Sequence, residues 1–158
     1  DPRGTNELSL NRHIELFQEL DRVRLAGYDS HVLQPRYVAL DIRIDVCVKR
    51  DAFRGDVLEG LLDVLGSQRR VDGSLGFFHV DRFVFGQGLW RSALEAAVQR
   101  VRGVDGVRSI KYRKRRSPAD FKEMPAYVSV GRAEVLRVDS NPSRAERGSV
   151  HVVLEGGK

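Results

Sequence analysis

His79 and Asp81 are the residues whose types and spacing best suit chemistry. A histidine beside a carboxylate can act as a general base, or it can supply two ligands to a metal ion. A zinc site needs three or four ligands, and neither Cys47 nor the other histidines stand at a matching spacing. We therefore expect the polar atoms of this pair to pin a turn. We predict that the chain is not an enzyme and binds no metal or other cofactor.

A basic run near the middle of the chain is the strongest charge signal. Such a run can neutralise phosphates while Tyr112 stacks on a base, but it is also typical of an amphipathic strand that leads into a basic loop. No motif of a known nucleic-acid-binding module accompanies it, so an acidic protein neighbour is the preferred partner. The candidate interface residues are Lys111, Arg113, Lys114, Arg115 and Arg116.

Two further patterns match ligand sites only in part. Gly86-x-Gly88 lacks the third glycine and the Lys-Ser/Thr of a phosphate-binding loop. Asp139 and Asn141 do not have the spacing of an EF-hand loop, and a turn is the simpler interpretation.

An aromatic block in the stretch 75–94 is the densest apolar feature of the sequence. Aromatic side chains bury large areas and need specific partners, so the block is either the centre of a packed core or an anchor for another protein. A core is the ordinary case for buried aromatic residues. The block comprises Phe77, Phe78, His79, Asp81, Arg82, Phe83, Phe85 and Trp90.

Composition limits the possible classes of protein. The 158 residues are 41% hydrophobic and 31% charged, which is typical of a globular chain with a sizeable core. The net charge of +5 fits either a nucleic-acid partner or an Arg-rich protein surface. A single cysteine excludes an internal disulfide, and no apolar run approaches the ~20 residues of a membrane span.

Hydrophobic periodicity predicts an alternation of helices and strands. Strict alternation from Val38 to Val48 predicts a long strand with one buried face. Ser9 or Asn11 can cap the first helix, and Asp51 can cap the second. The expected helices span about 10–25, 52–65 and 89–101, and the expected strands span about 38–48, 107–115, 127–130, 133–138 and 150–154. We expect short extended segments at 76–79 and 82–85, and a loop over 117–127.

This order of elements predicts an α+β fold, a two-layer sandwich in which two helices pack on a mainly antiparallel sheet. The expected organisation is an N-terminal helix and linker (1–36), an α+β core domain (37–116) and a β-rich C-terminal tail packed on or beside that core (117–158).

The stretch from Gly76 to Gln87, GFFHVDRFVFGQ, resembles the signature of the putative baseplate assembly proteins. These are baseplate J-like wedge proteins of contractile phage tails and phage-tail-like injection systems. Weaker similarities follow in the expected order at 24–29, 35–42, 101–107, 131–138 and 148–157. Val80 and Gly88 stand where the family pattern has prolines, and Trp90 stands where it has tyrosine.

The resemblance implies a structural role without chemistry. It implies that the chain is the C-terminal region of a longer wedge protein, in agreement with the absence of an initiating methionine. The implied partners are a second wedge protein, the hub and spike, sheath-proximal proteins, and copies of the chain itself in a ring. The implied location is the cytoplasm during assembly and then the finished particle. A basic α+β nucleic-acid-binding module is the alternative function.

Overall fold

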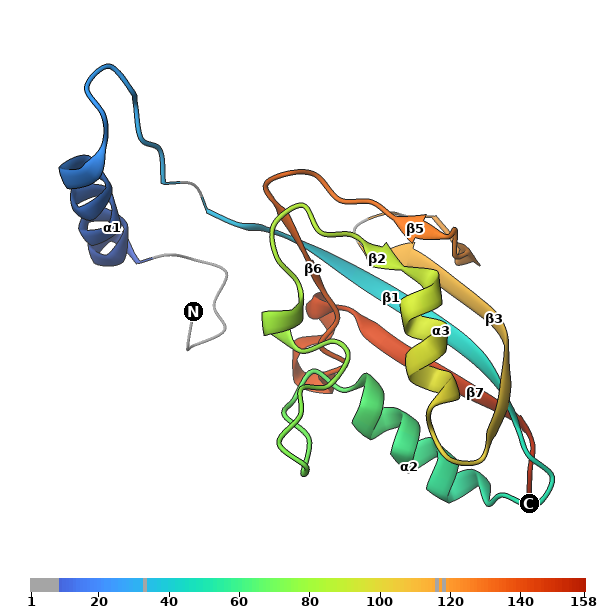
Figure 1. Cartoon of the computed structure of the whole chain (residues 1–158). Coiled ribbons are helices and arrows are strands. Elements are labelled where there is room, and N and C mark those ends of the chain that lie inside the picture. The colour runs from blue at the N-terminus through green and yellow to red at the C-terminus, as the bar shows by residue number, and fades with distance from the viewer. Residues whose placement is uncertain (1–8, 33, 116, 118) are drawn as a thin grey trace. The chain divides into compact units, whose positions relative to one another are not determined.

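The computed structural model describes residues 9–32, 34–115, 117 and 119–158 (Figure 1). The chain divides into two compact units, residues 1–36 and 37–158, and each is described by itself.

In the described part of the first unit, residues Leu10–Val23 form helix α1. Ser9 caps it as predicted, because its Oγ accepts a hydrogen bond from the backbone N–H of Arg12 at 3.4 Å. Ile14 and Phe17 lie on the apolar side of the helix, yet none of its residues is buried. The helix is therefore amphipathic and carries an exposed apolar stripe.

The second unit is built on a five-stranded sheet around β1 (Arg36–Val48). On one side β1 pairs with β3 (Val104–Lys114), which in turn pairs with β4 (Lys122–Glu123), and both pairings are antiparallel. On the other side β1 pairs with β6 (Glu134–Arg137) and, in parallel, with β7 (Ser149–Gly156). Residues 117–158 thus contribute three strands to the same sheet as the predicted core.

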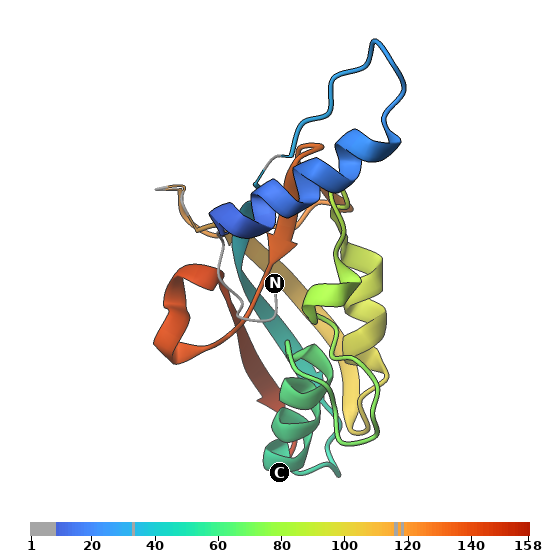
Figure 2. The same cartoon turned by 90° about the vertical axis from the view of Figure 1, so that its left-hand side faces the viewer.

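Two helices, α2 (Arg54–Leu65) and α3 (Arg91–Gln99), cover one face of this sheet (Figure 2). α3 packs on β3, and α2 packs on β7 and on α3. The core between the layers contains the alternate residues of β1 that the period-two pattern predicted, including the fully buried Leu40, Ile42 and Ile44. The other face of the sheet carries the polar residues of the same strands.

A second, two-stranded sheet joins β2 (Leu89–Trp90) to β5 (Tyr127–Val128) in antiparallel register. Two short 3₁₀ segments, η1 (Val80–Arg82) and η2 (Pro142–Arg147), complete the unit.

The α+β class is confirmed. The sheet is mixed, because β7 runs parallel to β1 whereas the pairs β1–β3 and β3–β4 are antiparallel. Several local expectations are wrong. Asp51 does not cap α2; Phe53 holds the cap position, and no side chain bonds there. The segments 76–79 and 82–85 are turns around η1 instead of strands, and the expected loop over 117–127 contains β4.

Candidate functional site

The basic run meets a buried carboxylate on the sheet. Asp41 projects from β1 and is 1% exposed. Its Oδ2 accepts a hydrogen bond from Nε of Arg113 at 3.0 Å, and its Oδ1 accepts from Nη1 of Arg115 at 2.6 Å and from Oγ of Ser149 at 2.8 Å. The antiparallel register places Arg113 directly across from Asp41 on β3, and the parallel register places Ser149 beside it on β7. The cluster therefore joins three strands.

These contacts fix the ionisation of Asp41. Burial acts to raise the pKa of its carboxyl group, but the hydrogen bonds from Ser149, Arg113 and Arg115 outweigh burial and hold that pKa below its usual value. The carboxylate is charged at neutral pH and is fully occupied by its donors.

Arg113 and Arg115, two of the five predicted interface residues, therefore stabilise the fold. Arg113 also stacks on the ring of Phe121, with 4.8 Å from its guanidinium carbon to the ring centroid. Lys111 and Lys114 are exposed, and Arg116 lies outside the described residues. The run is consequently less available to an external anion than its composition suggests.

Part of the aromatic block belongs to the core. Phe78 is 3% exposed, and Phe77 and Phe83 are half-buried against the same core. The rings of Phe77 and Phe78 meet edge to face at 4.9 Å, and those of Phe78 and Phe83 stack at 6.1 Å. This arrangement is favourable for aromatic pairs and ties the loop after α2 to the sheet layer.

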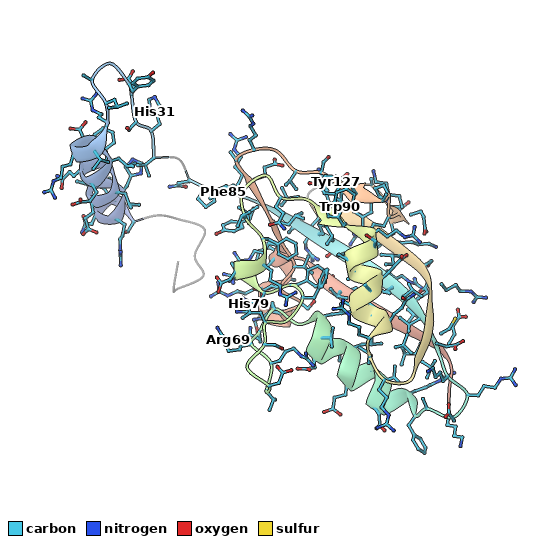
Figure 3. The ribbon with its side chains drawn as sticks, viewed as in Figure 1. His31, Arg69, His79, Phe85, Trp90 and Tyr127 are labelled. Atoms are coloured by element: carbon cyan, nitrogen blue, oxygen red, sulfur yellow. The ribbon has the colours of Figure 1, made fainter. Side chains whose placement is uncertain are left out.

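The rest of the block is exposed. Phe85 is 59% exposed and Trp90 is 56% exposed, although both are large apolar side chains. Trp90 contacts Tyr127 across the β2–β5 pair, with ring centroids 4.5 Å apart (Figure 3). We name Phe85, Trp90 and Tyr127 the aromatic surface residues.

Close packing holds Tyr127 in place. Its hydroxyl oxygen accepts a hydrogen bond from the backbone N–H of Gly88 at 2.9 Å. A Cβ at Gly88 would lie 2.2 Å from the carbonyl oxygen of Val128 and 2.5 Å from the Tyr127 ring, so a side chain cannot be accommodated there. The Gly88 contacts thus hold Tyr127, and Trp90 packs on its ring.

His79 and Asp81 form a turn, as predicted. His79 precedes η1, and its Nδ1 accepts a hydrogen bond from the backbone N–H of Asp81 at 3.2 Å. The ring nitrogen and the Asp81 carboxylate are 3.6 Å apart, and the carboxylate and Arg82 are exposed. No group of three or more metal ligands includes them in the described part of the chain.

Asp139 and Asn141 also stabilise local structure. The Asp139 carboxylate accepts hydrogen bonds from Ser67 at 2.8 Å and from Arg147 at 3.1 Å. Asn141 caps η2 through the backbone N–H of Ser143. Both residues act in the turn that the sequence predicted, and no metal-binding cluster of three or more ligands occurs among the described residues.

Sequence reasoning missed the roles of Asp41 and Tyr127. Asp41 looked like one more residue on the wetter face of a strand, and only the approach of β3 and β7 buries it. Tyr127 lies 37 positions after Trp90, and no local pattern joins the two. Gly88 was the one local signal, because a glycine beside an extended segment can mark a close approach of another backbone.

No family model and no curated protein matches the chain. Within the described residues, no helix is long and apolar enough to cross a membrane.

Proposed function

We propose that this chain is a structural part of a larger protein assembly, namely the baseplate wedge of a contractile phage tail or a phage-tail-like injection system. The resemblance of residues 76–87 to the baseplate assembly proteins supports the proposal. The observation that carries it is the division of the aromatic block into a buried part and an exposed part. The buried part serves the fold, and the exposed part is free to serve a neighbour.

The aromatic surface residues suit a protein contact. Tyr and Trp are enriched at protein interfaces, where a rigid ring buries a large area at little cost in conformational entropy. The fixed Trp90–Tyr127 pair has this property, and Phe85 adds a further exposed ring. The partners on this proposal are the second wedge protein, the hub and spike, the sheath-proximal proteins and copies of the chain. Assembly takes place in the cytoplasm.

Immunogold labelling of particles from the producing cells tests the role. Gold at one end of sheathed tubes supports the proposal, whereas label that is absent from such particles contradicts it. The variant Phe85→Ala/Trp90→Ala should remain folded and fail to enter particles. Phe53→Ala is the matched control, because Phe53 is also an exposed phenylalanine of the second unit but lies outside the aromatic block. Equal incorporation of both variants would show that the exposed rings contact no neighbour.

The alternative, a nucleic-acid-binding module, has lost part of its support. Among the described members of the basic run, Arg113 and Arg115 are engaged by Asp41, which leaves Lys111 and Lys114 exposed. A salt titration separates the two functions. Phosphate binding weakens steeply with salt, with a slope that reports the number of phosphates neutralised. Binding to duplex or single-stranded DNA with a steep slope would revive this alternative.

A further inference from the structure

The outer side of β7 is an open edge of the main sheet. β7 pairs with β1, and among the residues that the structure describes no strand pairs with it on the other side (Figures 1 and 2). An open edge offers unpaired backbone groups to any strand of suitable sequence, and proteins usually blunt or cover such edges. This strand is eight residues long and has the apolar centre Val152-Val153-Leu154.

The hydrogen bonds identify the backbone groups that point outward. The N–H of Val150 donates to Oγ of Ser140, the carbonyl oxygen of Gly148 accepts from the N–H of Ser140, and the carbonyl oxygen of Gly156 accepts from Nε of Arg54. Since alternate residues of a strand present their N–H and C=O to the same edge, Val152 and Leu154 point outward too. No described residue bonds to their N–H and C=O groups. The two ends of the edge are occupied, and its centre is open.

This edge is complementary to itself. When two copies of β7 are placed antiparallel about Val153, Val152 lies opposite Leu154 of the second copy. Both residues point outward, so they exchange a pair of hydrogen bonds on each side of the axis. His151 then lies opposite Glu155 of the second copy, on the polar face of the sheet. The Glu155 carboxylate accepts a hydrogen bond from Arg108 of its own chain and can accept a further one from the facing His151, and the arrangement repeats by symmetry.

The neighbouring helix adds an apolar surface on the same side. A Cβ at Gly60 would lie 3.0 Å from Val101, so that flank of α2 faces the end of α3. Leu58 and Leu62 lie about 200° around the helix axis from Gly60, and they are 37% and 53% exposed. Because α2 packs on β7 as well as on α3, its leucine flank faces the open edge. Pairing of two β7 strands would bring two such flanks together.

We propose that the chain forms a two-fold dimer through β7, in which the main sheets of two copies join into one continuous sheet and the leucine flanks of both α2 helices pack together. A second copy is the occupant that fits, because the free backbone groups, the facing His151 and Glu155 side chains and the leucine flank are all matched by the same elements of an identical chain. The inference does not rest on the proposed function. A dimer is measured on the purified chain, whereas the baseplate role is measured on particles.

Cysteine cross-linking of the full chain tests the register. Val153 lies on the proposed axis, where facing Cα atoms in a non-hydrogen-bonded pair are about 4.5 Å apart, within the range of a disulfide. Val153→Cys should therefore form a covalent dimer under mild oxidation. His151→Cys, on the same face of β7, is the control, because its two copies would lie about 13 Å apart along the strands. The unaltered chain controls for Cys47. Cross-linking of the control as fast as Val153→Cys would refute this register.

Sedimentation velocity over a range of concentrations tests the dimer itself. We expect a concentration-dependent species of twice the mass of one chain.

Val153→Lys places two like charges on the axis and should weaken dimerisation at least tenfold, whereas Val71→Lys, at an exposed loop position, should not. His151→Glu should weaken it, because it places a second carboxylate opposite Glu155, whereas His151→Gln should preserve it, because its amide can still donate a hydrogen bond to that carboxylate. Leu58→Gln/Leu62→Gln should weaken it without altering β7.

A chain that remains monomeric at every concentration would overturn the proposal. The outer edge of β7 would then be a site for a strand of a different protein. A dimer that is unaffected by Val153→Lys would overturn the proposal equally, because it would place the contact elsewhere.

Discussion

The buried carboxylate of Asp41 gives its arginine partners a role that their charge alone does not reveal. Arg113 and Lys114 are neighbours in the same basic run, but one contacts Asp41 and the other is exposed. Breaking a buried ion pair leaves an uncompensated charge, which is one of the few mechanisms by which a single substitution destabilises a protein severely.

Reversing the charge of Arg113 and of Lys114 in separate variants should affect the free energy of unfolding differently. Arg113→Glu places a second carboxylate beside Asp41 and should lower the free energy of unfolding by roughly 2–4 kcal/mol. Lys114→Glu should change it by no more than about 0.5 kcal/mol. Urea unfolding measures both. A variant that reverses Arg113, Lys114 and Arg115 together would therefore confound folding with binding, and Lys111→Glu/Lys114→Glu is the cleaner probe of an interface. Equal stability of Arg113→Glu and Lys114→Glu would show that the Asp41 cluster contributes little.

Acid should weaken the fold by protonating Asp41 and two other carboxylates. The pKa values of Asp41, Asp45 and Asp139 all lie below the usual value in the folded chain, so the unfolded chain binds more protons at mildly acidic pH. Their contribution is present above about pH 4, the unfolded pKa, and is lost as the pH falls through the folded values. The unfolding midpoint should therefore decrease from pH 5 to pH 3. Asp41→Asn should flatten this dependence, and an unchanged profile would contradict the assignment.

At the scale of elements, the aromatic block is divided between core and surface. Phe78→Ala should cost about 3–5 kcal/mol of stability, because it removes a buried ring and its two aromatic contacts. Phe85→Ala should cost less than about 1 kcal/mol, since the ring is exposed. Chemical denaturation of the two variants is a direct comparison. A large loss for Phe85→Ala would mean that this ring supports the fold after all.

Elements with a local pattern could be predicted from the sequence. The alternation from Val38 to Val48 and the apolar stripe from Ile14 to Leu20 identify β1 and α1 because each pattern is complete within its own segment. The start of α2 could not be predicted from Asp51, since the helix begins three residues later, after Phe53, where no side chain caps it. The turn over residues 76–79, expected as an extended segment, could not be predicted from apolar content, because its conformation depends on hydrogen bonds of residues 76–78 to residues 64–68.

Contacts between distant segments limit how much of the candidate site could be predicted from the sequence. Asp41 becomes buried only when Arg113 and Ser149 arrive from other strands, and Trp90 meets Tyr127 only through the β2–β5 pair. The sequence identifies the residues of such sites by type but does not show which of them meet. A local sequence pattern could not predict the parallel pairing of β7 with β1 either.

At the scale of the whole molecule, all buried core residues of the described chain lie between Leu40 and Val138. The segment 37–158 should therefore fold without residues 1–36, with one cooperative unfolding transition close to that of the full chain. An isolated helix as short as α1 is marginal in water, so a peptide of residues 9–25 should show little helix by circular dichroism. A fragment 37–158 without a cooperative transition would show that the first unit is required for folding.

The parallel pair of β1 and β7 also has a consequence for biosynthesis. Asp41 and Ser149, which bond across this pair, are 108 residues apart in the chain. At a synthesis rate of about 5–20 residues per second, β7 leaves the ribosome roughly 5–20 s after β1. During that time a strongly apolar strand has an uncovered side. The nascent chain therefore needs chaperone protection until β7 emerges, and slower translation of the final strand should raise the fraction that aggregates.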